Sequence, residues 1–365
     1  MRPRNIGDLA RIVGAAAADG GKLELRGGGS KAGVGAPRDA EIVDMTGFSG
    51  VLDYDPAELV LTAGAATPLA EIQAAVAERG QMLAFEPFDH GPMFGRPEGA
   101  ATIGGVIAAG VSGSRRLSRG AARDHLLGFK AVSGRGEAFV GGGKVVKNVT
   151  GYDLCKLVAG SWGRLAALTE VTLKVLPRPP VARSLEVRGL EPAQAVELMS
   201  KAMGSQAEVA AAAHAPGLTV IRLEGVGPSV EARALLIRAM GGRLLAEDRA
   251  ERFWAGLRNP LRNAEILWRL SVPPSRAPEL LQALDGEWRM DWAGGLIWIA
   301  PTDATAEGIR RAADAVGGHA MLMRAPEAMR AEVPALHPAG AGVAALEARV
   351  RRAFDPAGVF ETGRF

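Results

Sequence analysis

The chain has 365 residues, 48% of them hydrophobic and 23% charged, so its length favours two domains and its composition is that of a globular protein. The formal net charge is +3, and no lysine and arginine block is interleaved with aromatic residues, which argues against nucleic acid as a partner. The single cysteine, Cys155, excludes an intrachain disulfide and an iron–sulfur cluster held by this chain alone, since a cluster needs about four thiolates. The histidines are scattered without metal-ligand spacing, so we expect no metal site.

The N-terminus predicts an amphipathic helix. Apolar residues recur at helical spacing from Ile6 to Val13, and Gly20 marks the end of the pattern. Asp8 and Arg11 interrupt the apolar stretch that a secretory signal needs. No apolar run approaches the ~18 residues of a membrane span. We expect a cytoplasmic protein, and leave open an attachment to membranes through partner subunits.

Short strand-like runs separated by glycine clusters extend to about residue 177. One helix is predicted over 67–80, with Thr67 as its N-cap and Pro68 at its first position. Strands and helices mix without regular βαβ alternation, which favours an α+β arrangement over a doubly wound sheet. The expected strands are 23–25, 41–45, 51–55, 59–63, 126–132, 137–142 and 168–176.

The second half has a different pattern. After the proline-rich run 177–183, the order β-α-β-β-α is predicted twice, over 182–242 and over 264–318. Five of the six tryptophans lie in this half, where we expect them to anchor a core rather than form a binding platform. Apolar residues in 336–365 predict that the C-terminus packs back onto the rest of the protein.

The stretch RGGGSK, residues 26–31, is the first of three unusual glycine-rich segments. Glycine permits positive φ, so consecutive backbone N–H groups can converge on an anion, and Arg26 and Lys31 would add charge. A plain turn explains the same residues. The spacing matches neither a Walker loop nor the dinucleotide GxGxxG motif.

The second segment is 99–129. Thr102 can cap a short helix that contains Ile103, Gly104 and Gly105 in its first turn, which leaves backbone N–H groups open to a phosphate. Close packing of a helix on a strand would produce the same glycines.

The third segment is 147–177. Lys147, Asn148 and Thr150 precede a helix expected near Gly151 and Tyr152, and they offer polar groups beside an aromatic ring. Ordinary helix capping is the alternative reading.

Together and in this order, the segments resemble the FAD-binding domain of the vanillyl-alcohol oxidase and p-cresol methylhydroxylase (PCMH) group. The shared pattern is Arg-Gly-Gly-Gly, then Thr-Ile-Gly-Gly, then Thr-Gly-Tyr-Asp-Leu, and it spans roughly residues 5–177. Within that group, ATIGGVIAAGVSGSRR, KNVTGYDLCKL and the terminal FDPAGVFETGRF are similar to the FAD-binding E subunits of bacterial glycolate oxidases.

The resemblance implies an α+β fold in three parts. These are a two-part PCMH-type FAD-binding domain (1–177), a ferredoxin-like α/β cap domain (178–335) and a C-terminal segment that docks on the FAD domain (336–365). FAD would lie between the first two parts, bound non-covalently, because Ser30 stands near the position where covalent members carry the linking histidine. The implied FAD-binding residues are Arg26, Gly27, Gly28, Gly29, Ser30, Lys31, Thr102, Ile103, Gly104, Gly105, Ser112, Lys147, Asn148, Gly151 and Tyr152.

The resemblance also implies a subunit of a multi-subunit glycolate oxidase or dehydrogenase, which converts a small 2-hydroxy acid to a 2-oxo acid. Its partners would be a larger FAD-containing subunit and an iron–sulfur subunit. Residues 336–350 lack the Glu-His pair that substrate-oxidising members use, so no catalytic residue is assigned and an electron-relay role is favoured. A self-sufficient oxidase or dehydrogenase of another small alcohol or hydroxy acid, and an assembly subunit, are the alternatives. In the self-sufficient alternative, the cap segment 267–272 would bind a substrate carboxylate. Arg258, Arg269 and Arg311 are the candidate cap arginines for such a contact, but solvated side chains are the favoured interpretation for all three.

Overall fold

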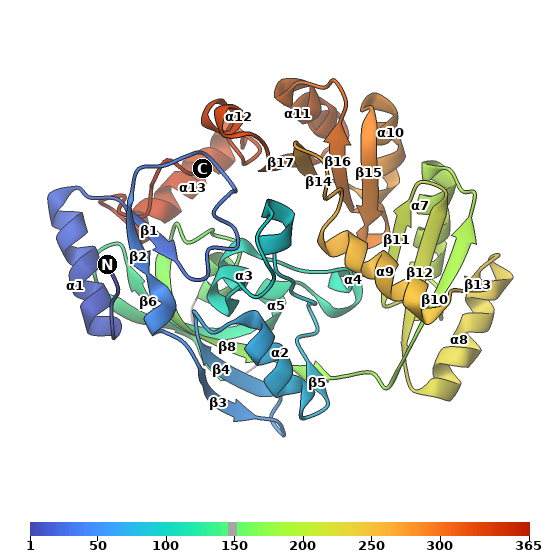
Figure 1. The fold of residues 1–365 in the computed structure, drawn as a ribbon, viewed down its shortest axis with the longest axis horizontal. Coiled ribbons are helices and arrows are strands. Elements are labelled where there is room, and N and C mark those ends of the chain that lie inside the picture. Colours follow the sequence, from blue (N-terminus) through green and yellow to red (C-terminus); the bar gives the residue numbers. More distant parts are fainter. Residues whose placement is uncertain (145–151) are drawn as a thin grey trace.

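The structure is a computed structural model that describes residues 1–144 and 152–365. A five-stranded antiparallel sheet forms the centre of the first half, with α helices beside it (Figure 1). Two small two-stranded sheets accompany it, the parallel pair β1–β2 and the antiparallel pair β5–β9. The strands in sheet order are β3 (Val51–Asp55), β4 (Val60–Gly64), β8 (Ala166–Lys174), β6 (Leu126–Ser133) and β7 (Ala138–Gly142), then β1 (Leu23–Arg26) with β2 (Glu41–Asp44), and β5 (Gln81–Met82) with β9 (Leu176–Pro177).

Helices of the first half pack their apolar faces on this sheet. Helix α1 begins where the Asn5 side chain accepts a hydrogen bond from the Asp8 N–H, and it ends at Gly20 in the left-handed conformation. Ile72 and Ile107 pack against Leu61 and Val171 in a fully buried core. The helices are α1 (Ile6–Asp19), α2 (Leu69–Ala77), α3 (Ile103–Ala109), α4 (Arg116–Arg119), α5 (Ala122–His125) and α6 (Leu154–Val158).

One predicted helix start is wrong. Pro68, not Thr67, is the N-cap of α2, and it makes no side-chain cap hydrogen bond. The Thr67 hydroxyl instead donates to the Gly64 carbonyl at 2.6 Å and accepts from the Gly50 N–H at 2.9 Å. Thr67 therefore joins two neighbouring loops, a role that its position before a proline did not reveal.

The second half is an eight-stranded antiparallel sheet built from two similar units. The first runs β10-α7-β11-β12-α8-β13 and the second β14-α10-β15-β16-α11-β17, so the expected β-α-β-β-α order occurs in both. The sheet order β13-β10-β12-β11-β15-β16-β14-β17 is symmetric about the β11–β15 junction, where His214 pairs with Met290. The strands are β10 (Val181–Arg188), β11 (Ala211–Ala215), β12 (Leu218–Gly225), β13 (Arg243–Leu244), β14 (Leu267–Ser271), β15 (Gly286–Asp291), β16 (Leu296–Pro301) and β17 (His319–Arg324).

The two faces of this sheet have different neighbours. One face carries Ile221, Trp268 and Ile297 in a buried core with helices α7, α8, α10 and α11. Because successive residues of a strand point to opposite faces, Leu267, Leu296, Trp298, Met321 and Met323 share the other face, where they cluster with Val34 and Met93 of the first half. The helices are α7 (Pro192–Met203), α8 (Gly227–Ala239), α9 (Glu247–Arg258), α10 (Ala277–Ala283) and α11 (Ala306–Ala315).

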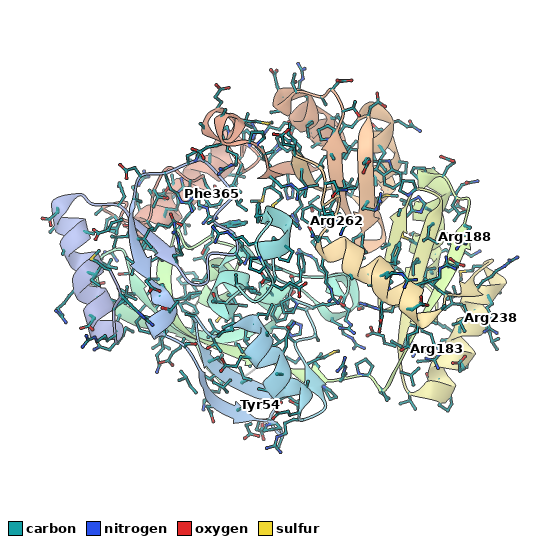
Figure 2. The ribbon with its side chains drawn as sticks, in the orientation of Figure 1. Tyr54, Arg183, Arg188, Arg238, Arg262 and Phe365 are labelled. Atoms are coloured by element: carbon teal, nitrogen blue, oxygen red, sulfur yellow. The ribbon has the colours of Figure 1, made fainter. Side chains whose placement is uncertain are left out.

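The C-terminal segment returns to the first half through α12 (Glu327–Glu332) and α13 (Ala341–Phe354). The Leu23 N–H donates to the Val359 carbonyl at 2.8 Å, and Val359 is fully buried. Phe365 lies with the first half, whereas Arg183, Arg188 and Arg238 lie on the second sheet and its helices (Figure 2). Among the described residues, no helix has the length and apolar character required to cross a membrane.

Candidate functional site

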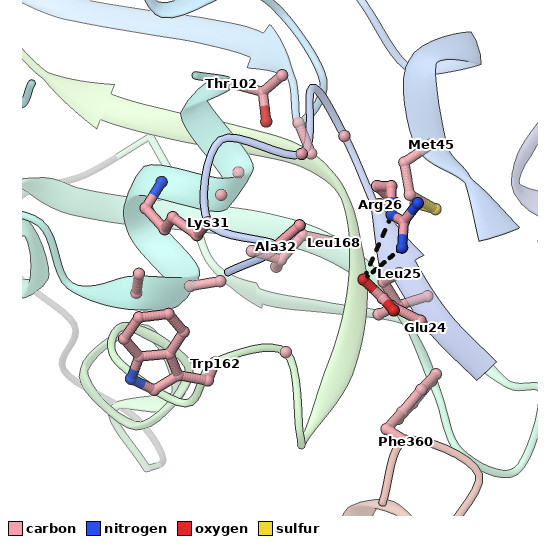
Figure 3. Close-up of a pocket in the computed structure, with 18 of the residues that line it drawn as sticks. Glu24, Leu25, Arg26, Lys31, Ala32, Met45, Thr102, Trp162, Leu168 and Phe360 are labelled. Atoms are coloured by element: carbon pink, nitrogen blue, oxygen red, sulfur yellow. Dashed lines mark hydrogen bonds and ion pairs between the residues drawn. The ribbon is translucent and has the colours of Figure 1, made fainter. Parts of the chain in front are cut away.

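A pocket of the first half opens above the glycine-rich loop (Figure 3). The loop 26–32 forms one wall and the start of α3 a second, and the segments 162–164 and 360–365 are among those that form the remaining walls. Of the residues predicted to bind FAD, those that line this pocket are Arg26, Gly27, Gly28, Gly29, Ser30, Lys31, Thr102, Gly104 and Gly105. The loop 26–31 and the start of α3, about 75 residues apart in the chain, thus line one pocket, as the resemblance to FAD-binding domains implied.

The loop glycines matter mainly because they let the loop backbone approach its neighbours closely, and less because they adopt backbone angles that other residues avoid. A Cβ on Gly27 would lie 2.6 Å from the Thr102 Oγ1, and one on Gly28 would overlap the Ala100 carbonyl oxygen. Only Gly29 has a positive φ, 72°. The expectation that the loop depends on left-handed glycines thus holds at one position, while the other two let the loop pack on the segment before α3.

The backbone of this loop is rich in unpartnered donors. None of the N–H groups of residues 27–31 donates a hydrogen bond to a residue that the structure describes. The buried Lys31 ammonium contacts the Ser30 Oγ at 3.3 Å, and burial lowers its pKa to about 8 despite the nearby Asp89. Successive free N–H groups beside a desolvated ammonium form a site for an anion.

The other predicted residues lie elsewhere. Ile103 is fully buried in the core beneath α3. Ser112 lines a second cavity, and its hydroxyl accepts from the Ala122 N–H at 3.0 Å. Tyr152 is 92% exposed. Lys147, Asn148 and Gly151 lie outside the described residues, so their assignment stays a prediction.

Four residues that the sequence analysis missed complete the first pocket. Trp162 lines it, and the Arg164 guanidinium pairs with Glu361 at 3.2 Å. Arg364 donates to the Val34 carbonyl at 3.0 Å and to the Lys31 carbonyl, so the C-terminus holds the glycine loop in place. Burial lowers the pKa of Arg364 to about 9. The only signal in the sequence for these pocket residues was the pair Arg364 and Phe365 at the C-terminal end of the chain.

The second cavity lies between the two halves and shares Ala109 and Trp162 with the first pocket. Strand alternation places Arg269, Ser271 and Trp298 on its wall, opposite the 109–116 segment. The cavity measures about 380 Å³. The expectation that Arg269 is solvated is wrong, because its side chain is half-buried at this boundary and desolvation lowers its pKa to about 10.

The remaining cap arginines differ from Arg269. Arg311 is exposed on α11 and pairs with Glu307 at 3.3 Å, as expected of a solvated residue. Arg258 is half-exposed and lies 3.6 Å from Glu86. Of the three arginines, Arg269 alone lines the cavity half-buried and without an acidic partner among the described residues.

The first pocket fits the anionic part of FAD. The free N–H groups of the loop and the Lys31 ammonium suit a pyrophosphate, and a Cβ on either of two loop glycines would disturb the wall that presents them. Apolar walls for uncharged parts of a ligand come from Met45, Leu168 and Phe360. The two cavities are neighbours that share Ala109 and Trp162, so an elongated ligand held at the loop would point toward the boundary between the halves.

A family model described as a FAD binding domain matches residues 1–142. The glycolate oxidase subunit GlcE of Escherichia coli is 37% identical over 360 residues, which cover 98% of this chain and 96% of that protein. The chain belongs to the GlcE family. The glycolate oxidase subunit GlcD of Bacillus subtilis is 30% identical over 51% of this chain and 38% of its own length.

The solved structures agree with this GlcE-family assignment at the level of fold. p-Cresol methylhydroxylase has a TM-score of 0.70 at 14% identity, over 100% of this chain and 88% of that one, and an alkyldihydroxyacetonephosphate synthase has 0.69 at 15%, over 99% and 76%. The predicted resemblance, the PCMH-type α+β fold and the FAD cofactor are confirmed. The chain is a FAD-dependent oxidoreductase.

Proposed function

We propose that this chain is the FAD-binding subunit of a multi-subunit glycolate oxidase and that it relays electrons rather than holding the primary substrate site. The observation that carries the proposal is the near full-length similarity to a glycolate oxidase subunit GlcE. The more limited similarity to a subunit GlcD supports a complex of related chains, in which the second is a larger FAD-containing partner.

The residues of the first pocket would hold FAD. The N–H groups of residues 27–31 and the Lys31 ammonium would bind the pyrophosphate, while Thr102 and Gly104 bring α3 against the loop. Arg364 would keep the loop in position through its bonds to Val34 and Lys31. Bound FAD supplies hydride acceptance and electron release, chemistry that amino-acid side chains alone do not provide.

Two features support a relay function. The sequence contains one cysteine, so an iron–sulfur centre that receives electrons would belong to another subunit. Residues 336–350 lack a Glu-His pair, and in the described part of the chain no three His, Cys, Asp or Glu residues are grouped to hold a metal ion. The described residues thus offer FAD a site without an evident set of metal ligands beside it.

The test is anaerobic addition of glycolate to the pure FAD-loaded chain, followed by addition of the larger flavin subunit and the iron–sulfur subunit. We expect the flavin absorbance to remain oxidised with the chain alone and to bleach in the assembled complex. A second experiment mixes the reduced chain with the iron–sulfur subunit and follows electron transfer by stopped-flow absorbance.

Rapid bleaching of the flavin by glycolate in the pure chain would instead establish a self-sufficient enzyme. The cavity lined by Arg269 is the observation that favours this alternative. A complex whose activity survives removal of FAD from this chain would establish an assembly role. Either result contradicts the relay.

A further inference from the structure

Helix α13 has no buried side chain. None of its residues, Ala341–Phe354, is buried by the part of the chain that the structure describes. Val343 and Leu346 are each 57% exposed, and Val350 is half-buried. A helix of this length, 14 residues, is only marginally stable alone in water, because most helical stability in proteins comes from the packing of an apolar face. The described residues give α13 little packing of that kind.

The C-terminal end of α13 is anchored on the first half. The Gly134 N–H donates to the Phe354 carbonyl at 3.0 Å, and the ring centres of Phe354 and Phe139 lie 6.0 Å apart. The other end lacks such support among the described residues, because the N-cap Gly340 makes no side-chain hydrogen bond and residues 341–347 are all exposed. The first two turns of α13 are therefore open to a partner.

The larger apolar side chains of α13 form one stripe. Val343, Leu346 and Val350 recur at intervals of three and four residues, so they share one face of the helix. The same spacing is used by helices that bind in an apolar groove of another protein. The exposed stripe thus has the form of a docking helix.

Positive charge borders this stripe. The helix contains three arginines and one glutamate. Arg351 pairs with Glu347 at 3.6 Å and with Glu361 at 2.9 Å, whereas the exposed Arg349 and Arg352 form no ion pair with a described residue. Arg349 follows Leu346 by three residues, which places it beside the stripe. A complementary surface therefore carries carboxylates around an apolar centre.

Ion pairs link α13 to the first pocket. Glu361, the partner of Arg351, lines that pocket and also pairs at 3.2 Å with Arg164, another lining residue. The segment 360–365, which follows the helix in the chain, forms part of the same wall. A protein bound along α13 would thus be fixed to an element that contacts the wall of the FAD pocket.

We propose that α13 is the docking surface for the iron–sulfur subunit, and that this partner offers an apolar groove bordered by carboxylates. The inference rests on the proposed relay function, since a relay must bring its electron acceptor to the flavin pocket. The stripe of Val343, Leu346 and Val350 would fill the groove, while Arg349 and Arg352 would pair with the acidic rim. Small contacts of this kind are usual between proteins that exchange electrons.

Two other occupants fit the surface less well. A second copy of this chain would bring the same arginines together in a symmetric contact, where they would repel each other. A helix that lies in a membrane interface commonly carries Trp, Phe or Leu on its apolar face, whereas this stripe has one leucine and two valines, and Phe354 packs against Phe139. The charge and the short stripe favour an acidic protein.

The experiment measures binding of the FAD-loaded chain to the purified iron–sulfur subunit and, separately, to the purified larger flavin subunit by biolayer interferometry. Leu346→Asp should weaken binding to the iron–sulfur subunit by about tenfold or more, because it brings a charge into an apolar contact. The double variant Arg349→Glu with Arg352→Glu should weaken it by a similar factor, because like charges then face each other. Added salt should weaken the unaltered complex.

Matched controls lie on α8 and β13 of the second sheet. Leu235→Asp replaces a leucine that is 60% exposed, and Arg238→Glu with Arg243→Glu reverses two exposed charges. Both controls should bind as the unaltered protein does. FAD content and thermal melting should stay the same in every variant, because no substituted side chain is buried. Weaker binding then reports a lost contact and not a lost fold.

Unchanged affinity of both α13 variants for the iron–sulfur subunit would overturn the inference and leave the relay function standing. Variants that lose only the larger flavin subunit, only self-association in sedimentation, or only binding to vesicles that contain phosphatidylglycerol would also overturn it, because each result identifies a different occupant. An unaltered chain that binds neither purified subunit would contradict the proposed function itself, and the inference with it.

Discussion

Glu86 and Arg222 face each other across the boundary between the two halves, with both Nη–Oε distances at 3.0 Å. Arg115 adds a second bridge, because it contacts Glu86 at 3.7 Å and pairs with Glu224 at 2.8 Å. The Arg222 guanidinium also stacks 4.6 Å from the centre of the Trp254 ring. This buried cluster of two carboxylates and two guanidinium groups links the halves beside the cavity that Arg269 lines, and Glu86 forms part of the cavity wall.

Replacing Glu86 by Gln should destabilise the protein. The change leaves Arg222 and Arg115 to share one carboxylate, that of Glu224, so the buried cluster carries an uncompensated positive charge, which costs up to about 3–5 kcal/mol of unfolding free energy. Urea denaturation of both proteins measures the difference. Asp248→Asn, in the exposed Arg252–Asp248 pair of α9, is the control and should change stability little.

The same cluster makes the effect of Glu86 pH-dependent. Burial alone would raise the pKa of Glu86, but Arg222 and Arg115 outweigh it and hold that pKa at about 2, below its usual 4.5. A carboxyl group whose folded pKa is lowered stabilises fully above its unfolded pKa and loses this contribution as pH falls toward the folded pKa. The stability difference between the two proteins should therefore shrink from pH 5 to pH 2, and a constant difference would contradict the ionic origin.

Asp291→Asn should stabilise the protein, which is the opposite of the effect expected for Glu86→Gln. Burial raises the pKa of Asp291 to about 6, so its ionised form costs stability, and this cost grows as pH rises from about 4 to 6. An amide can still accept from the Trp292 N–H and donate to the Ser114 hydroxyl oxygen. Thermal melting should show a higher Tm for the variant at pH 7.5 and a smaller gain at pH 4; a lower Tm at pH 7.5 would show that the negative charge is stabilising.

The sequence predicted local structure well and the partners of charged groups poorly. The loop 26–31 and α3 were predicted from a glycine pattern shared with the family that the sequence resembles, and in the structure these glycines let the two segments approach closely. The strands of the second sheet were predicted from their apolar runs. Arg222 and Glu86 are 136 residues apart, and Arg364 holds a loop 333 residues earlier, so no local pattern connects either pair. The prediction for Arg269 was wrong for a related reason. Alternation along β14 shows that Arg269 and Trp268 lie on opposite faces of the sheet, but it does not show which face the first half of the protein covers.

Gly28→Val should abolish FAD binding. A Cβ at this position overlaps the Ala100 carbonyl oxygen, so the loop must move away from the segment before α3 and its N–H groups lose their common direction. FAD content per chain, measured by absorbance after desalting, should fall to near zero. Gly256→Ala in α9, where a Cβ has no neighbour within 4 Å, is the control. A soluble Gly28→Val protein with one FAD per chain would show that the loop is only a turn.

FAD should be released without breaking a covalent bond. Ser30 lacks the nucleophilic ring nitrogen needed for a histidyl linkage, and burial raises the pKa of Cys155, the only thiol, to about 11, so that little thiolate is present. Acid precipitation should leave the yellow colour in the supernatant. Flavin in the washed pellet would contradict this prediction.

Lys31→Met should weaken FAD binding while it stabilises the FAD-free protein. Without FAD the ammonium is buried among unpartnered donors, and the lowered pKa of about 8 means that folding disfavours its charge at pH 7. A methionine of similar length removes that cost and fills the same space.

With FAD, the ammonium of Lys31 would gain an anionic partner, so its loss should raise the Kd for FAD by about tenfold or more. Melting curves of the FAD-free proteins and FAD titrations followed by flavin fluorescence measure the two effects separately. The stabilisation of the FAD-free variant should diminish as pH rises above 8, where Lys31 is neutral in the folded protein but still charged when unfolded. A variant that loses stability and keeps its FAD affinity would show that Lys31 serves the fold and not the pyrophosphate.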